Sequence, residues 1–248
     1  MSEKIKITKK KGGQIQFMAE GITPAFANAL RRIMISEVPA MAVEWVEMHQ
    51  NSSALFDEVI AHRLGMIPIG FDPEKFNLAD DCKCKGKGCP SCEVAFSVEK
   101  SGPCIVYSGD MKSSNKDVKA TDPRFPIVQL LKGQTIKLDA FTRVGTGKNH
   151  IKWQAAIASY SYSPDAVNEE KENINVCPKH MPSILSRKKT VVDSEKCEIC
   201  RLQSNPSRFM FRVESASGLD PEYIVSRAAQ ILAQKAEDFK KEIGRELS

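Results

Sequence analysis

Four cysteines stand close together in a polar part of the chain and have the chemistry to hold a metal ion. Residues 82–92 read CKCKGKGCPSC, so two short cysteine pairs are joined by a segment that contains glycine. Zinc favours four soft ligands in a tetrahedron, and lysines between the cysteines would partly offset the charge of four thiolates. We therefore expect a closed, structural zinc site, with a metal-free or oxidised loop as the alternatives. Its ligands would be Cys82, Cys84, Cys89 and Cys92.

A second group of metal-binding residue types is less specific. Cys177 and His180 precede a basic stretch, and Cys197 and Cys200 follow it. Three thiols with a histidine could hold zinc, three thiols could hold an iron–sulfur cluster, and the residues could equally bind nothing. The surrounding residues, 163–206, lose hydrophobic periodicity, so we interpret them as a separate small module.

Other candidates for catalysis do not meet the requirements of known chemistry. Residues 143–150, RVGTGKNH, lack both the glycine spacing of a phosphate loop and the hydroxyl residue after the lysine, so we predict a turn. Glu58 and His62 lie one helical turn apart, but no third metal ligand is evident. No nucleophile and base arrangement accompanies the other histidines. The sequence therefore predicts no active site in this chain.

Composition places the chain among soluble globular proteins. It has 248 residues, 42% hydrophobic and 27% charged, and a formal charge of +5, which is only a weak indication of acidic partners. No apolar run approaches the length of a membrane span, and the first residues are charged, so we expect a cytoplasmic protein. In that compartment eight cysteines indicate metal ligands before disulfides.

Hydrophobic periodicity predicts an α+β chain. A hairpin is expected in residues 3–19 and helices at 24–36, 54–65 and 221–247. Strands are expected at 40–50, after the cysteine-dense insertion, at 104–107, 134–142 and 151–160, and from 208 onward, with a short extended segment after Gly65.

The first predicted helix has two faces of different character. Its core face should carry Phe26, Leu30, Ile33 and Met34. Ile35 lies on the opposite face among Asn28, Arg31 and Arg32. This face would suit contact with another chain, although an ordinary surface helix with one exposed aliphatic residue is the alternative.

The last predicted helix carries an apolar stripe along its whole length. About 40 Å of helix exceeds what the core of one domain of this size covers, so part of the stripe should meet a partner chain. The alternative is a helix that packs entirely on its own sheet. The stripe consists of Ile224, Ala228, Ile231, Leu232, Lys235, Ala236, Phe239, Ile243 and Leu247.

Two segments resemble a known family. Residues 28–70, NALRRIMISEVPAMAVEWVEMHQNSSALFDEVIAHRLGMIPIG, closely resemble the signature of the alpha-like subunits of DNA-directed RNA polymerase, and GTGKNHIKWQAA at 145–156 resembles their second motif. With its cysteine module the chain is similar to the larger alpha-like subunits of the archaeal enzyme, the counterparts of the third-largest subunit of eukaryotic polymerase II. The resemblance implies a dimerisation domain of residues 1–41, 153–165 and 207–248, a mostly-β insert at 42–152 with a zinc loop at 82–92, and a ferredoxin-like module at 166–206.

The resemblance also implies a role. Members of this family are non-catalytic scaffold subunits of a nucleotidyltransferase, so this chain would form a heterodimer with the small alpha-like subunit L and then dock the large catalytic subunits. Arg31 and Arg32 would face the second-largest subunit, small subunits N and P would be neighbours, and DNA would be contacted only through the complex. The partner interface would include Asn28, Arg31, Arg32, Ile35, Ile224, Ile231, Leu232, Phe239 and Ile243.

One position departs from the family pattern. Members with an iron–sulfur cluster usually have another cysteine soon after the pair that corresponds to Cys197 and Cys200, where this chain has Gln203. A four-iron site with four cysteines is therefore excluded within the module, which leaves a three-iron cluster, zinc with His180, or no metal. The rival functions are a zinc-dependent hydrolase, which would need an open metal site, and a nucleic-acid-binding protein, which would need clustered arginine and aromatic residues.

Overall fold

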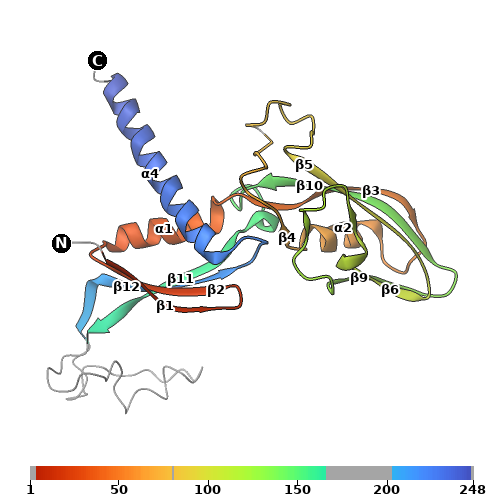
Figure 1. Cartoon of the computed structure of the whole chain (residues 1–248), viewed down its shortest axis with the longest axis horizontal. Coiled ribbons are helices and arrows are strands. Elements are labelled where there is room, and N and C mark those ends of the chain that lie inside the picture. The colour runs from red at the N-terminus through yellow and green to blue at the C-terminus, as the bar shows by residue number, and fades with distance from the viewer. Residues whose placement is uncertain (1–3, 80, 166–202, 247–248) are drawn as a thin grey trace, which may run out of the picture.

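The structure is a computed structural model that describes residues 4–79, 81–165 and 203–246 (Figure 1). Within these ranges three α-helices and four antiparallel sheets form a mixed architecture. Most of the predicted ferredoxin-like module lies outside the described residues, and so do Cys177, His180, Cys197 and Cys200. No helix in the described ranges combines the length and the apolar character that a membrane-spanning segment requires.

The elements follow the predicted order with a few additions. The helices are α1 (Pro24–Ser36), α2 (Asp57–Gly65) and α4 (Pro221–Glu246), and short 3-10 helices occur at η1 (Ser108–Asp110) and η2 (Ile151–Trp153). The strands are β1 (Lys4–Lys11), β2 (Gln14–Glu20), β3 (Ala40–Asn51), β4 (Ile69–Gly70), β5 (Glu93–Ser101), β6 (Cys104–Tyr107), β7 (Lys112–Ser113), β8 (Lys119–Ala120), β9 (Pro126–Leu130), β10 (Thr135–Gly145), β11 (Ala156–Asp165) and β12 (Gln203–Ser215).

The first sheet joins the two ends of the chain. Its order is β1-β2-β12-β11, so β12 lies between the early strand β2 and its own neighbour in sequence, β11. Alternate residues of β2 are buried, and Phe17 of β2 stacks on Phe211 of β12 with ring centroids 4.9 Å apart. Helices α1 and α4 lie on the face of the sheet that carries these two rings (Figure 1). The apolar face of the sheet is thereby buried under two helices.

Helix α1 begins as the sequence predicts. The Thr23 hydroxyl accepts a hydrogen bond from the Phe26 amide, and Pro24 occupies the first turn, where its missing N–H costs nothing. Its buried residues are Ala27, Leu30, Ile33 and Met34. The prediction that Phe26 belongs to the core is wrong, because its side chain is 43% exposed. Helical side chains point back toward the N-terminus, so a residue in the first turn points past the helix end.

The second sheet, β3-β10-β5-β7, carries a separate hydrophobic cluster made of residues between Met41 and Val144. Helix α2 and the pairs β4–β8 and β6–β9 complete this part of the chain. Strands β7, β8 and β9 were not predicted. The strand predicted at 151–160 is wrong at its start, because Ile151–Trp153 form η2, in which the His150 ring accepts from the Lys152 amide.

The two hydrophobic clusters meet at a small number of close contacts. Phe71 packs against both clusters. The turn after β10 lies on the C-terminal end of α1, where the Lys148 amide donates to the Ser36 carbonyl at 2.8 Å. The Lys148 amide is therefore engaged by α1 and not free to bind a phosphate, in agreement with the prediction of a turn at 143–150. The division of the chain into a dimerisation domain and an insert remains a prediction.

Gly147 sits where the turn approaches α1 most closely, which gives a test of this junction. A Cβ at residue 147 would lie 2.6 Å from the Ile35 carbonyl oxygen and 3.2 Å from the Ser36 Cα, both of them backbone atoms. Gly147→Ala should therefore lower the free energy of unfolding by about 1–3 kcal/mol through overpacking. Urea unfolding followed by circular dichroism measures the loss.

Gly244→Ala is the matched control, because nothing lies within 4 Å of a Cβ at that helical position. It should leave stability unchanged or raise it by up to about 1 kcal/mol. Equal effects of the two substitutions would show that the turn does not bear on α1.

Candidate functional site: a four-cysteine centre and an uncovered helix

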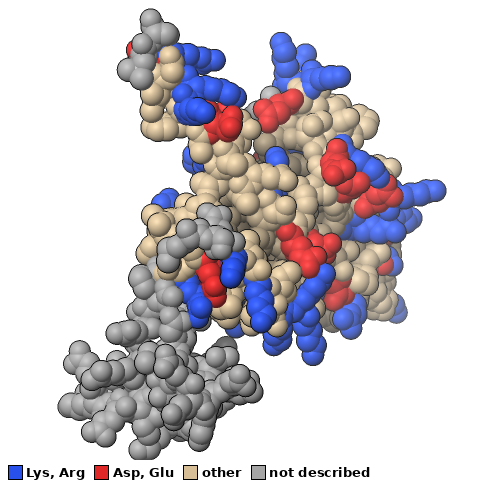
Figure 2. Space-filling view, turned by 60° about the vertical axis from the view of Figure 1, so that its left-hand side comes forward, with Lys and Arg blue, Asp and Glu red and all other residues tan. Residues whose placement is uncertain are grey.

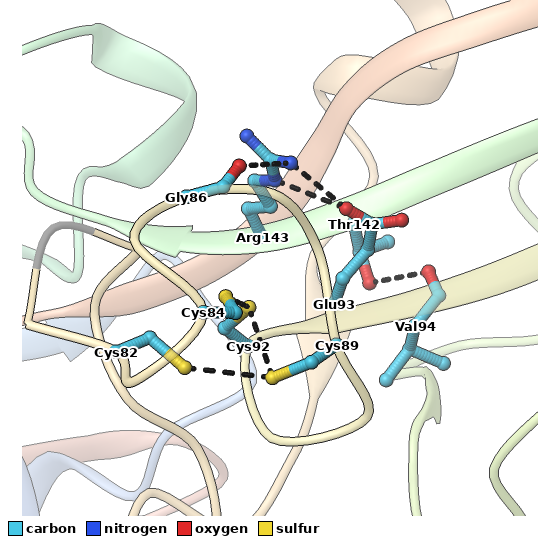
Figure 3. A network of polar contacts seen from close by, with 9 residues as sticks. All are labelled: Cys82, Cys84, Gly86, Cys89, Cys92, Glu93, Val94, Thr142 and Arg143. Carbon is cyan, nitrogen blue, oxygen red and sulfur yellow. Dashed lines mark hydrogen bonds and ion pairs between the residues drawn. The ribbon is translucent and has the colours of Figure 1, made fainter.

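The four predicted zinc ligands come together in the loop that leads into β5. The sulfur of Cys89 lies 3.5 Å from that of Cys82 and 3.6 Å from that of Cys92, and the sulfurs of Cys84 and Cys92 are 3.4 Å apart. All four sulfur atoms lie within 4.8 Å of one another and point into the loop (Figure 3). Zinc–sulfur bonds of about 2.3 Å in a tetrahedron set neighbouring sulfurs about 3.8 Å apart. The donor set and its spacing therefore fit a single tetrahedral metal ion.

Backbone turns position these sulfurs. The Lys85 amide donates to the Cys82 carbonyl at 2.9 Å, and the Cys92 amide donates to the Cys89 carbonyl at 2.9 Å, so each cysteine pair is folded back on itself. Gly86 and Gly88 have φ values of +77° and +89°, a region that L side chains rarely adopt. The glycines between the pairs thus allow the reversal that the sequence spacing implied.

The local environment separates the pKa values of two of the thiols, those of Cys84 and Cys92. A hydrogen bond with Cys92 lowers the pKa of the Cys84 thiol to about 6. Burial raises the pKa of Cys92, whose side chain is inaccessible to solvent, to about 12. Because a metal binds thiolates, it must displace the proton from the buried thiol. Four protein sulfurs also fill a tetrahedron, so such a site offers no position to a substrate.

The second candidate surface is the far part of α4. Ile224 and Ala228 are completely buried, and Ile231 and Leu232 are half-buried against the first sheet's core. Lys235 forms an ion pair with Glu37, the residue that follows α1. From residue 236 to Glu246 every residue of α4 is exposed. At 1.5 Å per residue these 11 residues, 236–246, project by roughly 16 Å. Figure 1 shows α4 extending away from the sheet and from α1.

The projecting part of α4 keeps the apolar stripe. Phe239 is 68% exposed and Ile243 is 43% exposed, and with Ala236 they recur at helical spacing on one face. The stripe that begins in the chain's own core thus continues where no described residue covers it.

The predicted interface residues do not all offer surface to a partner. Ile224 has no accessible surface, so it supports α4 from within the chain, and its place in the interface prediction is corrected. Ile35 is half-buried and packs on the core of its own chain. On α1 the Arg31 guanidinium donates to the Asn28 side chain at 3.0 Å, and Arg32 is exposed.

Sequence reasoning missed an apolar patch on the edge strand β1. Ile5 and Ile7 pair with Ala19 and Phe17 of β2, which are buried, so all four residues lie on the helix-covered face of the sheet. Ile5 is nevertheless 75% exposed and Ile7 55% exposed. The alternation with lysines in β1 could have placed both isoleucines on the core face of the sheet. It could not have shown that this face stays exposed at β1.

The surface charges are mixed. In the view of Figure 2, lysine and arginine side chains are spread over the surface with acidic side chains among them. Many of the basic side chains have a carboxylate partner, such as Lys10 with Glu222 at 2.7 Å and Arg208 with Glu20 at 2.8 Å. In this view the basic side chains are therefore interspersed with acidic ones, unlike the one-sign basic surface that is typical of a nucleic-acid-binding protein.

Comparison with known proteins identifies similar chains. The family model of the RNA polymerase Rpb3/Rpb11 dimerisation domain matches residues 16–236. The chain is 36% identical to the DNA-directed RNA polymerase subunit Rpo3 of Archaeoglobus fulgidus over 97% of its own length and 98% of that protein. It is 38% identical to the subunit of the same name from Pyrococcus horikoshii over 98% of both chains, and 35% identical to that of Methanothermobacter thermautotrophicus over 94% and 96%.

The four-cysteine geometry predicts the metal content of the purified chain. We expect the 82–92 loop to hold one zinc ion, and Cys89→Ser should lower the zinc content by about one ion per chain after dialysis against a chelator, because serine replaces a thiolate with a weak ligand. Cys84 and Cys89 are half-buried, whereas Cys82 and Cys92 are buried, so a substitution at Cys89 should disturb folding less than one at either buried cysteine. Elemental analysis by mass spectrometry gives the stoichiometry.

Cys104→Ser is the control. The Cys104 thiol lies outside the loop and contacts the Ser101 carbonyl at 3.6 Å. Its replacement should leave the metal content unchanged. Equal metal content in the wild type and in Cys89→Ser would refute the four-thiolate assignment.

Proposed function

The chain belongs to the RNA polymerase Rpb3/Rpb11 dimerisation-domain family, and on that premise we propose that it is a non-catalytic assembly subunit of a DNA-directed RNA polymerase. The observation that carries the proposal is the apolar stripe of α4, which leaves its own core and continues for the last 11 described residues of the helix. An assembly subunit needs such a surface, and an independent globular enzyme does not.

The energetics favour a permanent partner on this stripe. Burial of a Phe or Ile side chain contributes about 1.5–3 kcal/mol relative to exposure in water. Phe239 and Ile243 remain 68% and 43% exposed in the described part of their own chain, so much of this gain is still available to them. Helices in proteins owe most of their stability to packing of an amphipathic face, which the projecting part of α4 lacks. A second chain that packs on the stripe would supply it.

The proposed partner is the small alpha-like subunit L of the same enzyme. Ala236, Phe239 and Ile243 would bury against its helices, and the half-buried Ile231 and Leu232 would continue the contact toward the core. The exposed Arg32 and its neighbour Arg31 would face carboxylates of the second-largest subunit, because guanidinium groups bind carboxylates in a bidentate manner. Small subunits N and P are further proposed neighbours, and DNA would be reached only through the assembled enzyme.

We propose zinc as the metal of the 82–92 loop. The four sulfurs lie within 4.8 Å of one another, which matches one tetrahedral ion. An iron–sulfur cluster places several metal atoms between its cysteine ligands and would require the sulfurs to be farther apart. The ion would hold a loop that has too few apolar side chains to form a core. It would take no part in nucleotidyl transfer, because all four of its positions would be filled by cysteine.

The uncovered stripe predicts how the chain behaves without its partner. Expressed alone, the full-length chain should self-associate or aggregate, whereas co-expression with the small alpha-like subunit should give a soluble 1:1 heterodimer. Size-exclusion chromatography with light scattering distinguishes the two states. A monodisperse monomer that is as heat-stable as the co-expressed complex would contradict the assembly proposal.

Substitution within the stripe tests the surface itself. Phe239→Asp combined with Ile243→Asp should weaken pairing about a hundredfold or more, because unpaired carboxylates would be buried at the contact. Lys241→Asp is the matched control, since residue 241 lies on the opposite side of the helix and its side chain forms an ion pair with Asp238 at 3.7 Å. Titration calorimetry or co-purification yields measure the effect. Undiminished pairing of the double variant would exclude α4 from the interface.

A further inference from the structure

We propose that Arg143 of β10 is the positioning residue of the metal loop, which it holds in the conformation that the metal requires. The proposal rests on the zinc assignment for residues 82–92, not on the polymerase role of the chain. It concerns a contact between the loop and the second sheet that lies outside the four ligands.

The Arg143 guanidinium joins the loop to the strand that follows it. Its Nη2 donates to the Gly86 carbonyl at 3.1 Å and to Oε2 of Glu93 at 3.0 Å, and its Nε donates to the same carboxylate oxygen at 3.2 Å. Figure 3 shows the guanidinium between Gly86 and Glu93, above the four sulfurs. The side chains of Arg143 and Glu93 are only 22% and 19% exposed, so their contact is not a solvated surface pair.

The arginine itself is held in place on the sheet. Its guanidinium lies 4.4 Å from the centroid of the Trp45 ring, and Trp45 stacks on Phe141 at 5.1 Å between centroids. On its backbone side, the Arg143 carbonyl accepts from the Trp153 indole N–H at 3.1 Å. A planar guanidinium can lie flat on an aromatic ring while its fork of N–H groups donates to two acceptors, a geometry that the compact ammonium of a lysine does not reproduce.

The second half of the contact comes from Glu93. Its carboxylate lies against Gly88 so closely that a Cβ at residue 88 would be 2.7 Å from Oε2. Arg143 thus meets the loop at Gly86, and Glu93 meets it at Gly88. These two glycines carry the positive φ values that reverse the chain between the cysteine pairs. The turn that sets the distance between the pairs is therefore fixed from β10 and β5.

Charge alone does not explain the arrangement. Glu93 neutralises Arg143, so the pair adds no net charge near the thiolates. The three loop lysines, Lys83, Lys85 and Lys87, are exposed and remain the positive groups that offset the charge of a four-thiolate site. The contribution of Arg143 is therefore geometric: it holds the turn in place and so keeps the sulfurs close together.

The test compares metal release among variants of the full-length, zinc-loaded chain. Arg143→Gln should release zinc to a chromogenic chelator about tenfold faster than the wild type, the lower end of the effect known for groups that orient metal ligands. Arg143→Lys should also release it several-fold faster, because it keeps the charge but not the forked contact. Glu93→Gln provides a second, shape-conserving variant if Arg143→Gln does not fold.

Thr142→Val is the matched control. Thr142 neighbours Arg143 in β10, but its hydroxyl donates to the Val94 carbonyl at 3.0 Å inside the sheet and does not contact the loop. Its substitution should lower the melting temperature without speeding zinc release. The visible spectrum of the cobalt-loaded protein should change in Arg143→Gln and remain that of the wild type in Thr142→Val.

The proposal would be overturned if Arg143→Gln and Thr142→Val released zinc faster in proportion to their loss of melting temperature. It would also be overturned if Arg143→Lys released zinc as slowly as the wild type, or if the wild-type chain held no metal. A chain that pairs with its partner but holds no metal would refute the zinc assignment together with this inference. The assembly role would remain.

Discussion

Helix α4 starts inside the chain's own core and ends outside it, and one apolar stripe runs through both parts. Ala228 is buried under the first sheet, while Phe239 on the same stripe is mostly exposed. The rest of the fold serves this arrangement, because β2 and β12 bring the two ends of the chain together and α1 lies beside α4 on their apolar face. The described part of the chain does not supply the free energy that the exposed part would gain by burial, and we propose that another polypeptide does.

The loop at 82–92 solves a different problem of stability. Its residues are too polar and too rich in glycine to form a hydrophobic core, and a metal with four thiolates can replace one. The loop also has a firm base, because Cys82 and Cys92 are buried and the Arg143–Glu93 pair contacts its two glycines. The loop is thus held from the second sheet, whereas the projecting helix is held from the first.

Much of this could be predicted from the sequence, and the exceptions have physical causes. The cysteine spacing predicted a site whose four sulfurs do converge, because ligand spacing is a local property. The start of α1 followed from Thr23 and Pro24, and the start of α4 from Pro221. Phe26 was misplaced because periodicity ignores the direction of side chains in the first turn. Arg143 and Ile5 could not be identified, since their roles depend on strand pairing and on which faces stay uncovered.

The most direct measurement of the central claim is amide hydrogen exchange along α4. If the projecting part lacks tertiary packing in the free chain, amides of residues 236–246 should exchange fast there and become strongly protected in the heterodimer. Amides near Ala228 should be protected in both states, which calibrates the comparison. Protection of residues 236–246 already in a monomeric chain, or fast exchange there within the complex, would contradict the claim that a partner covers this helix.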